Sequence, residues 1–183
     1  MNIIEQARRL LGGRNPNSEV QWYGQFGFAC PQLGVHDFVW GKNRVVNQGI
    51  NHLLNAGLRG EGVISAFYIA PFVADITPAA TVTAATFNST LTEFTNYSQP
   101  TRPVWTSDAA STAQFLENAT VPSTITITAG AQTSIYGAGL LSVNGKGATT
   151  GILGAAAKAP APFLNLATGF EVKLKYKISG ASS

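Results

Sequence analysis

The chain has one cysteine, two histidines and few charged side chains. With Cys30 alone, no disulfide can form within the chain. His36 and His52 are too few for a zinc site at the usual ligand spacing. Charged residues make up 11% of the chain, whereas soluble domains carry about 25%. No window contains 18 uncharged apolar residues, so the sequence predicts no membrane span.

Threonine, serine, asparagine, alanine and glycine replace the missing charge. They make an uncharged surface, which suits a protein that is packed against neighbours, although a secreted or thermophilic β-protein has a similar composition. The net charge of +3 is spread along the chain, whereas nucleic-acid-binding proteins concentrate basic residues on one face. We therefore expect protein partners and no specific nucleic acid.

Motifs that support catalysis are missing. The chain has no Gly-x-Ser-x-Gly element for a nucleophile. Four acids are candidates for a glycosidase pair, but they are scattered, and we expect them to solvate loops and cap turns: Asp75, Glu93, Asp108 and Glu117. The run from Asn144 to Gly147 has turn chemistry and lacks the spacing of a phosphate loop. We predict a protein that is not an enzyme and binds no catalytic metal, cofactor or small-molecule substrate.

The first 42 residues are expected to form an arm. Residues 2–11 place apolar side chains on one helical stripe, and Gly12-Gly13 ends the run. Residues 20–40 are rich in aromatics and glycine, which indicates extended chain with pieces of strand. We expect much of the arm to pack on another chain. Its candidate contact residues are Ile3, Ile4, Leu10, Leu11, Trp22, Tyr23, Phe26, Phe28 and Trp40.

Residues 43–183 are expected to form the domain. A helix is predicted after residue 43, with Asn43 as its N-cap and Gly57 or Gly60 as its end. The pattern then changes to short strands separated by turns, which favours antiparallel structure. The predicted fold is mainly β: an antiparallel β-sandwich or jelly-roll-like domain with an N-terminal extended arm and one or two short helices.

The clearest strand is "FEVKLKYKI", from Phe170 to Ile178. Its apolar residues alternate with polar ones, so one face is predicted to point into the core. The other face carries Lys173, Lys175 and Lys177. Two interpretations remain open: the lysines contact a polyanion, or they protect an edge strand from aggregation.

The stretch "EFTNYSQPTRPVWT" combines aromatics, an arginine and two prolines. Pro100 and Pro103 remove backbone donors, so this stretch cannot be a central strand. Arg102 between them could stack on Tyr97 or Trp105. Two interpretations remain open: a contact cluster of Tyr97, Arg102 and Trp105 at the sandwich edge, or a loop whose tryptophan plugs the end of the sandwich.

Several of these elements together resemble a family of proteins. They are "VVNQGINHLLNAGL", "FYIAPF", "LTEFTNYSQPTRPVWT", "SIYGAGLLSV" and the closing strand, over residues 43–178. In this order, with the Tyr-x-x-x-x-Arg-Pro-x-Trp element, the chain resembles small structural proteins of tailed bacteriophages, such as capsid decoration (cement) proteins. The first forty residues fall outside the resemblance.

The resemblance implies a virion component located on the capsid surface and made in the host cytoplasm. Its expected partners are the major capsid protein and copies of itself, with no membrane. A tail or fibre-attachment protein is the close alternative. A carbohydrate-binding β-sandwich is a further alternative, with Trp40, Tyr97 and Trp105 as stacking platforms.

Overall fold

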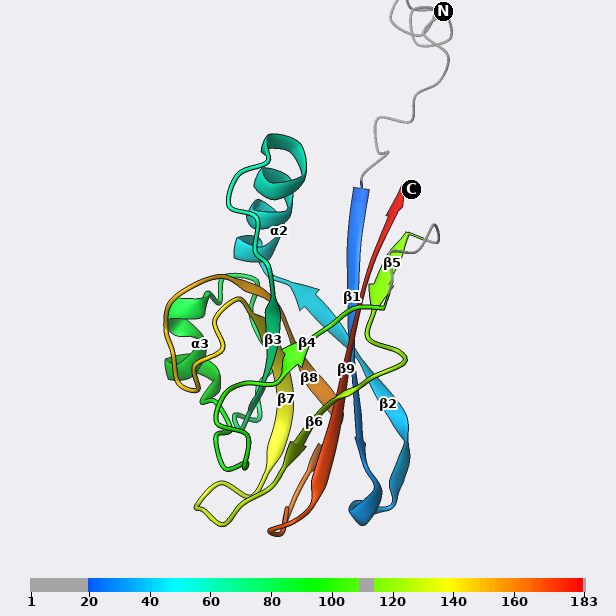
Figure 1. The fold of residues 1–183 in the computed structure, drawn as a ribbon, viewed down its shortest axis with the longest axis vertical. Coiled ribbons are helices and arrows are strands. Elements are labelled where there is room, and N and C mark those ends of the chain that lie inside the picture. The colour runs from blue at the N-terminus through cyan, green and yellow to red at the C-terminus, as the bar shows by residue number, and fades with distance from the viewer. Residues whose placement is uncertain (1–19, 109–113, 183) are drawn as a thin grey trace, which may run out of the picture.

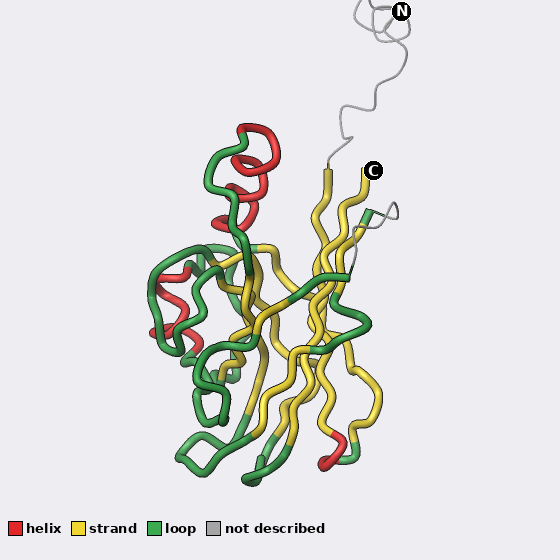
Figure 2. The backbone as a smooth tube through the Cα atoms, viewed as in Figure 1, coloured by secondary structure: helices red, strands yellow, loops and turns green. Residues whose placement is uncertain are grey.

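The computed structural model describes residues 20–108 and 114–182. Within them, two antiparallel sheets of five and four strands pack as a sandwich, with two short helices (Figure 1). The predicted β-sandwich is therefore confirmed. Figure 2 shows that strands make up most of the described backbone, and that the helices lie at the margins of the sheets.

The first sheet is built around a long hairpin. A short 3₁₀ turn at Pro31–Leu33 joins its two strands, and Gly34 at φ 77° makes the reversal. The last strand of the chain pairs with the first, and two short strands pair with the last. The members of this sheet are β1 (Val20–Cys30), β2 (Val35–Val45), β5 (Phe115–Glu117), β6 (Ser123–Thr126) and β9 (Glu171–Ser182).

The second sheet has the order β4-β3-β7-β8. The end of β2 also pairs with β8, through Arg44 and Val45, so β2 joins both sheets at one corner. Trp105 lies in a two-residue strand at the sheet edge, which confirms that the two-proline stretch is no central strand. The four strands are β3 (Phe67–Phe72), β4 (Val104–Trp105), β7 (Ile135–Leu141) and β8 (Leu153–Phe163).

The core lies between the two sheets. Alternate residues of β1 and β9 point inward, and the Phe26 and Tyr176 rings lie 4.6 Å apart. The predicted alternation of the last strand is confirmed by the burial of Val172, Leu174 and Tyr176. Together these side chains fill the space between the layers, and their burial supplies much of the hydrophobic stabilisation of the fold.

The second sheet is covered on its other face as well. Helix α3 (Ala84–Leu91) places Phe87 against Phe72 of β3, with the rings in a T-shaped contact. Gly139 leaves the room that the Phe87 ring occupies. A strand buried on both faces has no polar alternation, which explains why the "FYIAPF" of β3 is apolar throughout.

The predicted arm is wrong for its described part. Residues 20–42 form β1 and most of β2, and these strands belong to the sandwich itself. Phe26 and Phe28 are core residues, not contacts for another chain. A Cβ on Gly24 would overlap the Asn43 side chain of the paired strand, and a Cβ on Gly27 would lie tightly against the Trp40 ring. Ile3, Ile4, Leu10 and Leu11 lie outside the described residues.

The last strand is not an edge strand. Strand β9 pairs with β1 on one side and with β5 and β6 on the other. The interpretation of its lysines as protection of an exposed edge is therefore wrong. The three lysines lie on the outer face of the first sheet, and the polyanion interpretation stays a prediction.

The predicted helix after residue 43 is confirmed as α2 (Asn47–Leu54), which continues as a π-helical turn, η2 (Asn55–Arg59). It ends at Gly60 with φ 66°, one of the two predicted stops. The predicted N-cap is wrong, because Asn43 lies in β2 and donates to the Tyr176 hydroxyl at 3.1 Å. The helix lies directly on β8: a Cβ on Gly49 would overlap the carbonyl oxygen of Gly154.

Candidate functional site

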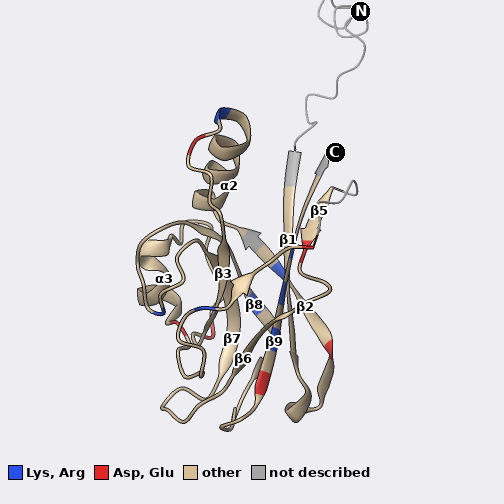
Figure 3. Ribbon diagram, viewed as in Figure 1, with Lys and Arg blue, Asp and Glu red and all other residues tan. Residues whose placement is uncertain are grey.

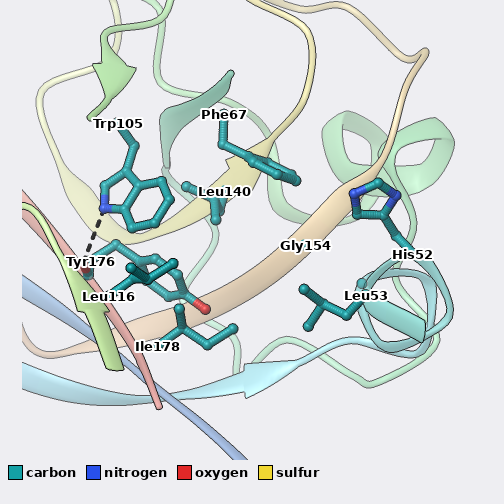
Figure 4. A pocket seen from close by; sticks show the side chains of 10 residues that line it. His52, Leu53, Phe67, Trp105, Leu116, Leu140, Gly154, Tyr176 and Ile178 are labelled. Carbon is teal, nitrogen blue, oxygen red and sulfur yellow. Dashed lines mark hydrogen bonds between the residues drawn. The ribbon is translucent and has the colours of Figure 1, made fainter. Parts of the chain in front are cut away.

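A small apolar cavity lies between α2 and the end of the sandwich. Its volume is about 140 Å³. In Figure 4, His52 and Leu53 of α2 lie across the cavity from Trp105 and Tyr176. The contact between α2 and β8 at Gly49 fixes the helix at this position. The lining residues are Gly49, His52, Leu53, Phe67, Trp105, Leu116, Leu140, Gly154, Tyr176 and Ile178.

Trp105 and Tyr176 use their side-chain polar atoms in hydrogen bonds at the edge of the cavity. The Trp105 indole donates from Nε1 to the Tyr176 carbonyl oxygen at 3.0 Å. The Tyr176 hydroxyl accepts a hydrogen bond from Asn43. Burial raises the pKa of Tyr176, and the Asn43 hydrogen bond partly opposes that rise. The His52 ring meets Phe67 edge-on at 5.9 Å. The cavity thus presents a carbon surface that suits apolar groups.

A wider hollow continues from the cavity toward the ends of β1, β5 and β9. It shares Leu53, Leu116 and Ile178 with the cavity, and its volume is about 500 Å³. Trp22 and Leu116 are more than one third exposed there. We call this hollow the apolar groove, and its lining is Trp22, Leu53, Gln114, Phe115, Leu116, Ile178 and Gly180.

Beyond the groove, α2 and η2 project from the body of the sandwich (Figure 1). Leu58 in η2 is 82% exposed, and Val63 after it is 73% exposed. Leu54 at the end of α2 is nearly half exposed. We call Leu54, Leu58 and Val63 the α2 tip. Exposed apolar side chains that lie together mark contact surfaces, so the α2 tip is a candidate for one.

The structure does not form the predicted contact cluster of Tyr97, Arg102 and Trp105, because Tyr97 and Arg102 are buried. Tyr97 is buried and stacks on Phe94, with the Lys146 ammonium 3.6 Å from its ring centre. Trp105 lies at the cavity, where it contacts Tyr176. The contact-cluster interpretation is therefore wrong. The tryptophan-plug interpretation agrees with the position of Trp105 at the end of the sandwich.

Arg102 is an internal residue with 1% of its surface exposed. It donates from Nε and Nη2 to the two carboxylate oxygens of Glu93, at 2.9 and 2.7 Å. It also donates to the carbonyl oxygens of Val143 and Ala148. Glu93 accepts a further hydrogen bond from the Gly147 backbone. The pair thus ties the two-proline stretch to the turn between β7 and β8, and Arg102 presents nothing to a partner.

The other candidate acids have separate partners. Asp75 pairs with Lys158, Glu117 lies 3.8 Å from Lys177, and Asp108 accepts hydrogen bonds from Thr120. Within residues 20–108 and 114–182, no group of three or more His, Cys, Asp or Glu side chains could hold a metal ion. The expectation that the protein is not an enzyme stays a prediction. None of the described helices is long and apolar enough to cross a membrane.

The outer face of the first sheet carries the lysines of β9 (Figure 3). The Lys175 ammonium lies 4.5 Å from the Phe38 ring centre, and the Lys177 ammonium lies 4.0 Å from that of Phe115. Trp40 is partly buried and packs with Phe38 against Gly27. Lys175 and Lys177 therefore cover aromatic rings on this face, which is a sufficient structural role for these two lysines. Tyr23, another predicted contact, is exposed on β1.

No protein-family model, no curated protein and no solved structure matches the chain. A functional interpretation therefore depends on the residues and their geometry.

The sequence does not single out the residues of the cavity, the groove and the tip as contact residues, apart from Trp22 and Trp105. One signal was present: the helix carries more leucines than a single buried stripe requires, at positions 53, 54 and 58. An excess of apolar residues on a short helix indicates that a second face needs a partner.

Proposed function

We propose that the protein is a non-enzymatic structural component of a tailed-bacteriophage virion. Its specific role in this proposal is that of a capsid decoration protein, which stabilises the head by bridging subunits of the major capsid protein. The observation that carries the proposal is the α2 tip: Leu54, Leu58 and Val63 are exposed, and α2 and η2 project from the β-sandwich (Figure 1). The sequence resemblance over residues 43–178 supports the same class of protein.

The tip would hold the protein on the particle by burying its apolar side chains. Transfer of one valine or leucine side chain from water into an apolar contact contributes about 1.5–3 kcal/mol. The tip offers three such side chains, and the contact would repeat at every copy on a particle. The sandwich keeps the tip in place because Gly49 brings α2 onto the backbone of β8. Such a role requires no catalytic group, only a folded domain that carries an apolar contact surface.

A tail or fibre-attachment protein is the close variant, and it would use the same surface. Copy number separates the two, since a decoration protein is present in hundreds of copies and a tail protein in a handful. The structure argues against the carbohydrate-binding alternative. Tyr97 is buried and Trp105 lies at the cavity, so Trp40 alone remains of its three stacking platforms.

The α2 tip is tested by a double substitution, Leu58→Asp with Val63→Asp. Both side chains are mostly exposed, so the melting temperature of the free protein should stay within about 2 °C. Incorporation into particles should fall at least tenfold, because two carboxylates would be buried at the contact. Quantitative mass spectrometry of purified particles measures the number of copies of the variant per particle.

The matched control is Val121→Asp, since Val121 is 70% exposed and lies between β5 and β6, outside the tip. This variant should be incorporated normally. Normal incorporation of the double variant would remove the tip from the proposal.

A further inference from the structure

We propose that the apolar groove is a docking site for residues 2–11 of the same chain. The occupant follows from the chemistry of the groove and from the position where the described chain begins. The inference does not depend on the proposed function, and it leaves the α2 tip free for a partner.

The groove accepts apolar side chains because its walls are apolar. Trp22, Leu116 and Ile178 come from three different strands, and Leu53 from α2 closes the other side. None of its lining residues is charged. The cavity behind it adds room for one further apolar side chain. A ligand for this groove therefore needs a row of apolar groups rather than a charge.

Residues 2–11 have such a row. Their sequence places Ile3, Ile4, Ala7, Leu10 and Leu11 on one stripe of a predicted helix, and Glu5 and Arg9 on the opposite side. Ten residues of helix are about 15 Å long. A helix this short is marginal in water unless its apolar face is covered. The apolar groove would supply such cover for this stripe.

Residues 12–19 are long enough to let residues 2–11 reach the apolar groove. Strand β1 begins at Val20, and Trp22, two residues later, already lines the groove. Residues 12–19 join this strand to the segment, and eight extended residues span up to about 26–29 Å. Gly12, Gly13 and the Asn15-Pro16 pair have the turn chemistry that a reversal toward the groove requires.

The short connection also favours the segment of the same chain over that of a second copy. A short tether gives an effective concentration on the order of mM. A second copy at micromolar concentration competes poorly with it.

Disulfide trapping in the full chain tests this docking. Ala7→Cys lies at the centre of the apolar stripe, and Leu116→Cys lies in the groove, where partial exposure spares the core. The native Cys30 can stay, because it is fully buried and its burial raises the pKa of the thiol. The control pairs Arg9→Cys, on the opposite side of the predicted helix, with Leu116→Cys.

We expect the Ala7 pair to form an intrachain disulfide at least tenfold faster than the Arg9 pair, seen as a shifted monomer on a non-reducing gel. Equal rates for the two pairs would overturn the inference. A cross-linked dimer as the main product would also overturn it, in favour of exchange between copies.

Hydrogen exchange provides a second measurement without new cysteines. In the full chain, Ile4→Asp with Leu11→Asp should raise amide exchange in α2 and β5 at least fivefold, whereas Arg9→Asp should not. Unchanged exchange in the double variant would contradict docking. Both experiments use the free protein, so their failure is distinct from a failure of particle incorporation.

Discussion

Replacement of Arg102 by alanine is expected to lower the free energy of unfolding by about 3–5 kcal/mol. The substitution leaves the Glu93 carboxylate in the interior without its cation, since both side chains of the pair are fully buried. It also removes the donors to the carbonyl oxygens of Val143 and Ala148. Urea denaturation followed by circular dichroism measures the loss.

Two comparisons separate the buried charge from other effects. Arg59→Ala breaks an ion pair with Glu61 in which both side chains are about two-thirds exposed, and it should cost less than about 1 kcal/mol. Glu93→Leu combined with Arg102→Met should recover much of the stability lost in Arg102→Ala, because no unpaired charge remains. A loss below 1 kcal/mol for Arg102→Ala would show that the pair is not buried as described.

Trp105→Ala is expected to cost about 3 kcal/mol, the lower end of the range for large aromatic residues, since Trp105 is only partly buried. The indole packs on Tyr176 and lines the cavity, so the substitution enlarges the cavity and removes packing contacts. Trp105→Phe keeps an aromatic ring and loses mainly the hydrogen bond to the Tyr176 carbonyl, which is worth about 0.5–1.5 kcal/mol. Equal denaturation midpoints for the two variants would contradict a packing role.

The sequence predicted those elements whose periodicity agrees with their surroundings. Strand β9 alternates because one face meets the core and the other meets solvent. Helix α2 was recognisable from its apolar spacing and from the glycine that ends it. The edge position of β4 followed from two prolines that cannot donate to a ladder. In each case a local rule and the global fold require the same structure.

The hairpin of β1 and β2 was not predicted, because its glycines are required by side chains of the neighbouring strand and not by a local turn. Position 27 favours glycine because the Trp40 and Phe38 side chains of the neighbouring strand lie over it. No pattern within residues 20–30 indicates that these side chains are there. The burial of Arg102 was missed for a similar reason. Its partner Glu93 lies nine residues away, and the carbonyl groups it satisfies lie more than forty residues away. Propensity rules treat an isolated arginine as a surface residue.

The candidate site was the least predictable part. It is assembled from α2 and from strands of both sheets, and tertiary packing alone brings them together. Of its residues, only Trp22 and Trp105 were expected to make contacts, and for different reasons. Leu58 and Val63 became informative only once the structure showed that both are mostly exposed and that η2, which holds Leu58, projects from the body of the sandwich (Figure 1).

A cryo-EM map of intact particles tests the proposed virion role most directly. We expect density for the β-sandwich in many copies on the head, with Leu58 and Val63 of the α2 tip buried against major capsid protein subunits. Particles that lack the chain altogether, or that hold it with the α2 tip in solvent, would contradict the account.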